Sequence, residues 1–321
     1  MEIFVRWVDT VKNIVTIGGG TGTSQILRGL KWNQDLDIVS IVTVTDDGGS
    51  SGILREDFNI LPPGDIRNNI LALAEQETFL TKLLKYRFNE GFLKNHNLGN
   101  IILLALTRIN GNNFPLAIKT LSEALKIRGK VFPASLDSLK LVAELDDGEI
   151  IFGETSIVLK NKNIKRIWLD GNAEAFDESV MAIQKADIII FGPGSLYTSI
   201  IPNILVDGIR NAINLCKARK VYIANIMTQP GETTNYSLKD HVKELENYLG
   251  EELDYIIANK SNLPDEIIQR YQKMGSIPVK LDMEADRRVM ISDLVYIIND
   301  EEPKIRHDPK KTSELILKCV R

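Results

Sequence analysis

Two neighbouring carboxylates, Asp46 and Asp47, stand directly before a run of small residues, Gly48-Gly49-Ser50-Ser51-Gly52. They follow an apolar, β-branched run at residues 38–44 that is typical of a buried strand. Glycines let backbone N–H groups approach a ligand closely, and the serine hydroxyls add donors for oxygen atoms. A turn alone needs fewer glycines. The run therefore predicts a ligand-binding loop at the end of a strand.

The same stretch closes with Pro62-Pro63-Gly64-Asp65, followed by Arg67 and Asn68. We expect Asp65 to cap a helix whose first turn carries Arg67 and Asn68. Acidic, hydroxyl and basic groups in one segment suit a phosphorylated ligand bound together with a metal ion. The candidate ion is Mg²⁺, and the candidate residue to bind it is Asp46. Adjacent side chains leaving a strand point in opposite directions, so we expect Asp46 to face the ligand and Asp47 to cap the glycine loop.

Two further strand-like runs lead into glycine-rich segments. The run at residues 13–17 precedes Gly18-Gly19-Gly20-Thr21-Gly22-Thr23, and the run at 187–191 precedes Gly192-Pro193-Gly194-Ser195. Helices are expected after them, at about Ser24–Lys31 and Ile204–Leu215. A glycine turn between a strand and a helix can bind phosphate on the free N–H groups of the helix start. The dinucleotide fingerprint is incomplete, because Thr23 occupies its last glycine position, and an NAD-dependent oxidoreductase is therefore disfavoured.

Polar residues also follow other apolar runs. Asn225 and Thr228 come after the run at residues 220–224, and His96 and Asn100 stand at the start of an apolar helix. For His96 and Asn100 the sequence leaves helix capping and ligand contact equally open. Arg306 precedes Asp308-Pro309, a helix start, and its planar guanidinium suits phosphate oxygens or a base.

Strand-like and helix-like segments alternate along most of the chain, and they carry these residues. This pattern predicts an α/β, Rossmann-like fold with a mostly parallel sheet and helices on both faces. The carboxyl ends of parallel strands share one edge, so the polar loops are expected to face a common crevice. The period changes at about 130–170, where Asp146-Asp147-Gly148 joins two alternating runs, and we expect a small inserted antiparallel element there with a structural or oligomer-forming role.

Length and composition set outer bounds on the function. The 321 residues are expected to form one domain, residues 1–321, with a leader at about 1–12. The net charge of −4 argues against a nucleic-acid partner. No apolar run reaches the ~20 residues of a membrane span, and the start lacks a signal-peptide pattern, so we expect a cytoplasmic protein. Two cysteines and three histidines, without ligand spacing, argue against zinc.

Five segments together resemble one known family: 18–22, 45–52, 62–68, 192–199 and 228–233. They are similar to those of the gluconeogenesis factor family, the YvcK-like branch of the CofD-like (2-phospho-L-lactate transferase) superfamily. The resemblance covers about residues 13–312. It implies a Rossmann-like fold and cytoplasmic proteins that bind UDP-sugars, notably UDP-N-acetylglucosamine, and support cell shape and cell-wall synthesis in gluconeogenic growth. Homo-oligomers and cell-wall-synthesis proteins are the expected protein partners.

Two classes of function stay open. The first is a regulator that binds a UDP-sugar without turnover. The second is a CofD-like phospholactyl or phosphoryl-group transferase that uses Mg²⁺; the deazaflavin signature of that branch is not found here. Asp46, Asp65 and His96 are candidate catalytic residues by type only. The predicted ligand-binding residues are Gly18, Gly19, Gly20, Thr21, Gly22, Thr23, Asp46, Asp47, Gly49, Ser50, Ser51, Asp65, Arg67, Asn68, Asn100, Gly192, Gly194, Ser195, Thr198, Asn225, Thr228 and Arg306.

Overall fold

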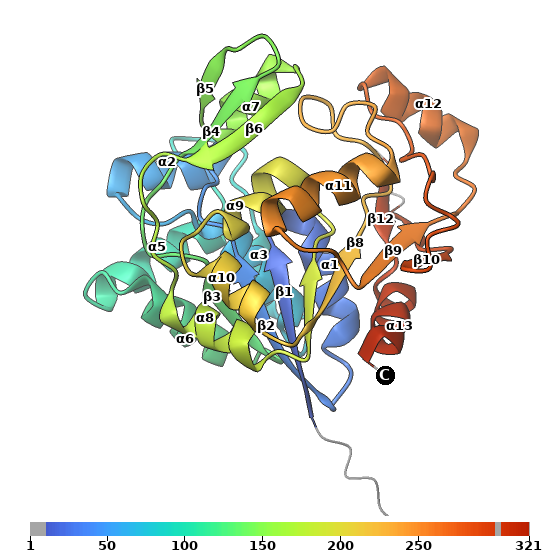
Figure 1. The fold of residues 1–321 in the computed structure, drawn as a ribbon. Coiled ribbons are helices and arrows are strands. Elements are labelled where there is room, and N and C mark those ends of the chain that lie inside the picture. Colours follow the sequence, from blue (N-terminus) through green and yellow to red (C-terminus); the bar gives the residue numbers. More distant parts are fainter. Residues whose placement is uncertain (1–10, 299–302, 321) are drawn as a thin grey trace, which may run out of the picture.

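A parallel β-sheet forms the centre of the computed structural model, which describes residues 11–298 and 303–320 (Figure 1). Most of the predicted leader, residues 1–10, lies outside the described residues. The sheet has seven strands in the order β10-β9-β8-β7-β1-β2-β3, and every neighbouring pair is parallel. The strands are β1 (Lys12–Gly18), β2 (Leu36–Val42), β3 (Lys130–Pro133), β7 (Ile188–Phe191), β8 (Arg219–Ile223), β9 (Tyr255–Asn259) and β10 (Val289–Ser292).

The strand order reverses between β1 and β7. Strands β2 and β3 continue from β1 to one side, whereas β8, β9 and β10 continue from β7 to the other. In open parallel sheets, the loops at the carboxyl ends of two such strands diverge and leave a crevice for a ligand. The segments that follow β1 and β7 are the glycine-rich runs of residues 18–23 and 192–195.

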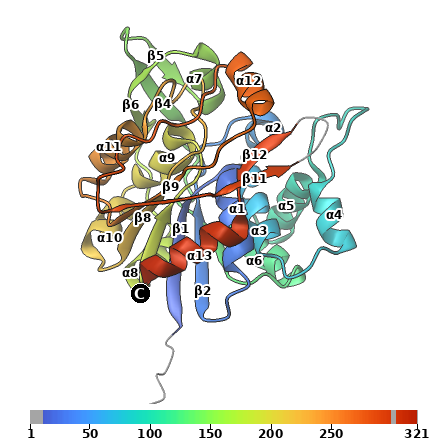
Figure 2. The same ribbon diagram turned by 90° about the vertical axis from the view of Figure 1, so that its right-hand side faces the viewer.

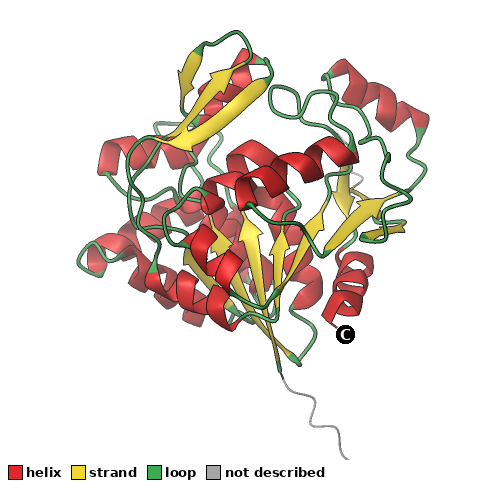
Figure 3. Ribbon diagram, in the orientation of Figure 1, coloured by secondary structure: helices red, strands yellow, loops and turns green. Residues whose placement is uncertain are grey.

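Helices cover both faces of the sheet, as predicted (Figures 2 and 3). Successive strand residues point to opposite faces, so Ile14 joins one apolar core and Ile17 the other. The first core is covered by α1 (Gly20–Leu30), α3 (Pro63–Leu73), α5 (Leu98–Ile109), α6 (Phe114–Ala124) and α13 (Pro309–Val320). The second is covered by α8 (Asp177–Lys185), α9 (Ile201–Ile204), α10 (Ile209–Leu215) and α11 (Leu238–Leu249).

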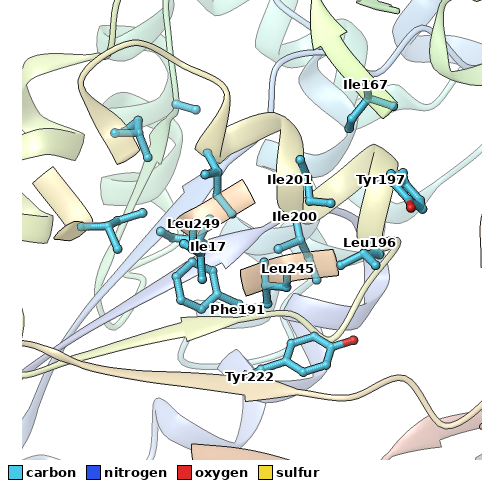
Figure 4. Close-up of a cluster of buried hydrophobic side chains, with 14 of the residues drawn as sticks. Ile17, Ile167, Phe191, Leu196, Tyr197, Ile200, Ile201, Tyr222, Leu245 and Leu249 are labelled. Carbon is cyan, nitrogen blue, oxygen red and sulfur yellow. The ribbon is translucent and has the colours of Figure 1, made fainter. Parts of the chain in front are cut away.

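The second core also reaches the π-helix η1 (Leu196–Ile200), which follows β7. Figure 4 shows Phe191 and Tyr222 of the sheet packed beneath Leu196 and Tyr197 of this helix. The same view includes Ile167 of the inserted element. Its backbone N–H donates a hydrogen bond of 2.8 Å to the hydroxyl of Tyr248 on α11. The inserted element is therefore anchored to the core of the main domain.

The inserted element is a three-stranded antiparallel sheet with one helix. It consists of β4 (Leu141–Leu145), β5 (Ile150–Phe152), α7 (Glu154–Lys160) and β6 (Ile164–Leu169), and the strand order is β5-β4-β6. The predicted turn at 146–148 is confirmed. The element begins later than predicted, since residues 130–133 form β3 and pair with β2 in the parallel sheet. It stands at the carboxyl end of that sheet (Figure 1).

One expectation about local structure is wrong. Residues 48–52 are not a loop; Gly49 begins helix α2 (Gly49–Phe58), because tertiary packing buries Ser50 and Ser51 and outweighs the low helix propensity of glycine and serine. Residues 277–280 form only isolated bridges, and β10 lies beside β9 in the sheet.

The remaining elements are α4 (Phe79–Lys85), α12 (Asp265–Lys273) and the antiparallel pair β11 (Val295–Ile298) and β12 (Lys304–His307). Asp308 caps α13 as predicted: its Oδ1 accepts a hydrogen bond of 2.9 Å from the N–H of Lys311. None of the helices within residues 11–298 and 303–320 has the length and apolar character needed to cross a bilayer.

Candidate functional site

A cavity of about 540 Å³ opens at the carboxyl ends of β1 and β7. This volume lies within the usual range for small-molecule sites. We call residues 18–23 the first glycine loop and residues 192–195 the second glycine loop. Both border the cavity, together with residues after β8, residues around α12, and β12. The predicted ligand-binding residues that line it are Gly19, Gly20, Thr21, Gly22, Gly194, Ser195, Asn225, Thr228 and Arg306.

The first glycine loop presents an uncapped helix start to the cavity. Gly19 is the N-cap residue of α1, no side chain caps this end, and the first turn holds no acidic residue. The first N–H groups of a helix lack partners within the helix and carry a partial positive charge, so they attract anions. Gly22 lies against the second loop: a Cβ atom there would be 2.2 Å from the carbonyl oxygen of Pro193. The close contact explains why this position is glycine.

The second glycine loop differs, because a protein carboxylate accepts from two of the first N–H groups of the helix that follows it. Glu232, only 5% exposed, accepts a hydrogen bond of 2.5 Å from Ser195 Oγ and others from the N–H groups of Tyr197 and Thr198. The Thr198 hydroxyl also points to Glu232. Burial raises the pKa of the Glu232 carboxyl, and these hydrogen bonds oppose that rise. The N-terminal amides of η1 therefore face an internal anion.

Side-chain amides hold the second loop in place. Asn225 exchanges two hydrogen bonds with Gly194: its Oδ1 accepts from the N–H at 3.1 Å and its Nδ2 donates to the carbonyl at 2.9 Å. Gln229 Nε2 donates to Ser195 Oγ at 2.8 Å. Thr228 Oγ1 accepts from the N–H of Ile277 at 3.0 Å. Ser195, Asn225 and Thr228 thus frame this wall of the cavity.

A cation stands in the cavity wall formed by β12. Arg306 is half-buried, donates to the carbonyl of Ile305 at 2.8 Å, and has no ion pair within the described residues. The neighbouring His307 is buried, and its Nε2 lies 3.1 Å from the carbonyl of Ala224. Burial lowers the pKa of His307 to about 4, so this imidazole is neutral at neutral pH. The positive charge on this wall therefore comes from Arg306.

An acidic cluster, Asp46, Asp65 and Glu154, lies behind the first glycine loop. Asp65 is not the cap of α3, because the chain enters that helix through Pro62. Its carboxylate instead accepts from the N–H of Gly20, and a Cβ atom at Gly19 would be 2.5 Å from its Oδ2. Glu154 reaches the cluster from α7 and accepts a hydrogen bond from Thr45 Oγ1. The alternating runs at residues 139–145 and 149–159 gave no sign that Glu154 meets Asp46.

Burial and mutual repulsion favour protons on this cluster. Burial, with a contribution from the charge of Asp46, raises the pKa of Asp65 to about 7. Burial also raises the pKa of Asp46 and holds the pKa of Glu154 well above its ordinary value, to which the charge of Asp46 adds. Carboxyl groups that keep a proton near neutral pH can act as acids or bases, or exchange the proton for a cation.

Asp46 and Asp47 have different partners, as expected for adjacent residues, but the role predicted for Asp47 is wrong. Asp46 Oδ1 accepts from the N–H of Gly48 at 2.9 Å, which is the capping role expected of Asp47. Asp47 turns away and accepts from the N–H and the hydroxyl of Thr155 at 2.9 and 2.7 Å. Asp47 thus fastens the first turn of α7 to the end of the β2 segment.

The other predicted residues lie outside the cavity lining. Ser51 accepts from the N–H of Gly64 at 3.1 Å and also hydrogen-bonds Asp46, whereas Gly49 is exposed. Thr23 and Gly18 lie against each other below the cavity, since a Cβ atom at Gly18 would be 2.5 Å from Thr23 Oγ1. Gly192 does not line the cavity, although the next residues of its loop do. A separate polar network contains Ser50, Arg67, Asn68, His96 and Asn100.

The carboxylates of the acidic cluster are suitable ligands for Mg²⁺. Across the described part of the chain, no group of three or more His, Cys, Asp or Glu side chains is arranged to hold a metal ion. Mg²⁺ commonly takes only one or two carboxylates and completes its shell with water and substrate phosphates. Asp46 and Asp65, beside the start of α1, suit that mode of binding with a phosphorylated ligand.

Known proteins resemble this chain over almost its whole length. The family of 2-phospho-L-lactate transferase CofD matches residues 14–295. A curated relative from Thermotoga maritima is 49% identical over 312 residues, covering 96% of this chain and 99% of its own length. The gluconeogenesis factor of Bacillus subtilis is 44% identical over 313 residues, covering 96% and 98%. A crystal structure of a Bacillus halodurans protein, 43% identical, superimposes with a TM-score of 0.91 and covers 95% of this chain and 99% of its own.

Proposed function

The chain belongs to the CofD family and, within it, to the gluconeogenesis factors, and we propose that it is a regulatory protein that binds UDP-N-acetylglucosamine or a similar UDP-sugar. The observation that carries the proposal is that one cavity of about 540 Å³ holds both the start of α1 and Arg306, which has no ion pair within the described residues. The diphosphate would lie at the first turn of α1, with Arg306 against its oxygens. Amide N–H groups and a guanidinium suit such an anion.

The cellular role that we propose follows from the family. The protein acts in the cytoplasm, where the UDP-sugar level controls its support of cell shape and cell-wall synthesis during growth on gluconeogenic carbon sources. The second glycine loop, closed by Glu232, serves as a fixed wall rather than as a second phosphate site. Binding without turnover is consistent with a cavity whose polar side chains are largely bonded to one another.

A specific observation also supports a transferase as the second candidate. Asp65 carries a pKa of about 7 and touches the first glycine loop, so it can take a proton from an acceptor hydroxyl. In that reaction the acceptor oxygen forms a bond to phosphorus, the proton passes to Asp65, and a nucleoside monophosphate leaves. When bound, Mg²⁺ would neutralise phosphate charge, with Asp46 as the residue that holds it.

Titration calorimetry and phosphorus NMR separate the two candidates. We expect UDP-N-acetylglucosamine to bind, and NAD to give no heat, because the dinucleotide fingerprint is incomplete. Phosphorus spectra of the bound UDP-sugar with Mg²⁺ are expected to stay unchanged over hours. If a guanosine diphosphate conjugate is instead cleaved to a nucleoside monophosphate in the presence of an acceptor alcohol, the transferase is the correct assignment and the regulator is not.

A further inference from the structure

A basic cluster of Arg67, Arg87 and His96 lies outside the cavity, where helices α2 and α5 begin. Arg67 is the deepest member, at 7% exposure; His96 is half-buried and Arg87 is exposed. None of the three lines the cavity at β1 and β7. The lining of that cavity therefore does not account for them.

Arg67 is a buried cation without a carboxylate partner. Its Nη1 donates to Asn100 Oδ1 and its Nη2 donates to Asn68 Oδ1 at 2.8 Å, so both acceptors are neutral amides. Its Nε–H is buried and has no hydrogen-bond partner. Within the described residues Arg67 forms no ion pair. Arginines are seldom buried unless they are paired with an anion, which leaves Arg67 in need of one.

Arg87 increases that need. Burial lowers the pKa of Arg67 to about 10, and the charge of Arg87 is the second cause of that lowering. The charges of Asp65 and Asp46 oppose that lowering, although neither carboxylate forms an ion pair with the guanidinium. Arg87 itself donates to the carbonyl of Asn95 at 2.5 Å and has no ion pair within the described residues. Two neighbouring guanidinium groups thus repel each other with no carboxylate bonded to either.

The hydrogen bonds of Ser50 fix the tautomer of His96. Ser50 Oγ accepts from the N–H of Asn97 and from Nδ2 of Asn100, both at 3.2 Å. Its own hydrogen is therefore available to His96 Nδ1, 3.4 Å away. A neutral histidine whose Nδ1 accepts carries its proton on Nε2. That Nε2–H has no acceptor within the described residues, so His96 offers one more donor.

Two helix starts add positive potential at the same place. The Arg67 side chain crosses the first turn of α5, since a Cβ atom at Gly99 would be 2.5 Å from Arg67 Cδ. Ser50 lies in the first turn of α2, which holds no acidic residue; Asp46, just before the helix, accepts from the N–H of the N-cap residue Gly48 and leaves the amides of the first turn uncapped. Both helices exceed two turns, so their N-terminal ends favour an anion nearby.

We propose that Arg67, Arg87, His96 and the first turns of α2 and α5 form a second anion site that binds a phosphate monoester, separate from the cavity at β1 and β7. Two guanidinium charges and two helix ends match a dianion better than a carboxylate. The phosphate can belong to a separate phosphorylated metabolite or to a second phosphate of a ligand that also enters the cavity. The two sources share the same chemistry at this site.

Inorganic phosphate is the probe for the site. Melting temperature is measured while sodium chloride is replaced by sodium phosphate at constant ionic strength. We expect a saturable rise for the wild type, and an apparent dissociation constant about tenfold weaker for both Arg87→Gln and His96→Ala, because each removes a charge-assisted or direct donor. Arg108→Gln is the matched control: it removes an exposed arginine at the far end of α5 and should bind phosphate like the wild type.

Saturation with UDP-N-acetylglucosamine separates the two sources of phosphate and keeps this test independent of the regulator proposal. A further, additive rise with phosphate indicates a separate metabolite, whereas loss of the rise indicates that one ligand fills both sites. Arg87 and His96 are both at least partly exposed, so their variants are expected to fold. The proposal is overturned if phosphate gives no saturable rise, or if Arg87→Gln and His96→Ala bind phosphate as tightly as the Arg108→Gln control.

Discussion

The two glycine loops look alike in the sequence and differ in the structure. Each follows a central strand and precedes a helix, and each borders the same cavity. At the first loop Gly19 provides no side-chain cap and Asp65 accepts from the N–H of Gly20, which leaves the amides of Thr21 and Gly22 available to a ligand. At the second loop Glu232 reaches the amides of Tyr197 and Thr198, so the corresponding donors are already used. The difference shows that a glycine turn before a helix predicts a phosphate site only where internal carboxylates leave some of the first amides of the helix free.

The contact between the loops gives the largest predicted effect. Gly22→Ala places a Cβ atom 2.2 Å from the Pro193 carbonyl oxygen, a backbone atom that cannot move alone. We expect a loss of about 3 kcal/mol in the free energy of unfolding, the upper part of the usual overpacking range. Urea unfolding measures it. Gly194→Ala is the matched control in the second loop, because its nearest neighbour would be Ser199 Cβ at 3.6 Å, an ordinary contact. Equal losses for both variants would contradict the difference in packing.

The next prediction concerns Arg306, the cation in the cavity wall. Arg306→Ala is expected to weaken UDP-N-acetylglucosamine binding by about 2 kcal/mol, the scale of a hydrogen bond to a charged group, and to leave the unliganded protein nearly as stable as the wild type. Titration calorimetry measures the affinity. Lys304→Ala removes an exposed cation from the same strand and serves as the control. Wild-type affinity in Arg306→Ala would show that β12 is only a structural wall.

The acidic cluster behind the first loop predicts an unusual pH dependence. The folded-state pKa of Asp65, about 7, lies well above the ordinary value for an aspartate. A raised acid pKa stabilises the folded form at low pH, and that stability is lost as the pH rises through about 7. Asp65→Asn can still accept from Gly20, so between pH 5 and pH 8 it should lose roughly 2.7 kcal/mol less than the wild type, because the wild type loses about 1.4 kcal/mol for each pH unit between 5 and the pKa of about 7. If urea unfolding shows the same loss of stability for both proteins, Asp65 does not hold a proton in the folded state near neutral pH.

The second loop provides the smallest predicted effect on binding. Glu232→Gln keeps the size of the side chain but offers one acceptor in place of two, so the free energy of unfolding should fall by about 1 kcal/mol. Affinity for UDP-N-acetylglucosamine should stay within about threefold of the wild type, since Glu232 faces the protein rather than the ligand. An affinity loss as large as that of Arg306→Ala would mean that both loops bind the ligand.

The sequence predicts the fold and the position of the cavity well, for local reasons. β-Branched runs, glycine turns and helix patterns are readable over short windows, and the carboxyl ends of parallel strands must share an edge. The parallel sheet, its two helical layers and the cavity between residues 18–23 and 192–195 follow from these signals. The hairpin turn at 146–148 and the cap at Asp308 were readable in the same way.

Contacts between distant segments account for what the sequence did not predict. Glu232 stands in a recognisable motif, but its pairing with Ser195 depends on how two loops meet in space. Glu154 enters the acidic cluster from an inserted element that has no sequence link to Asp46. Asp65 has the type and position of a helix cap, and only the approach of Gly20 assigns it another partner. Residue type and spacing do not carry that information.

Amide chemical-shift changes on ligand binding test the difference between the loops most directly. In a ¹⁵N-labelled sample titrated with UDP-N-acetylglucosamine, we predict large changes for the amides of Thr21 and Gly22 at the start of α1. The amides of Tyr197 and Thr198, already bonded to Glu232, should change little. Large changes at Tyr197 and Thr198 with none at Thr21 and Gly22 would contradict the assignment of the first glycine loop as the diphosphate site.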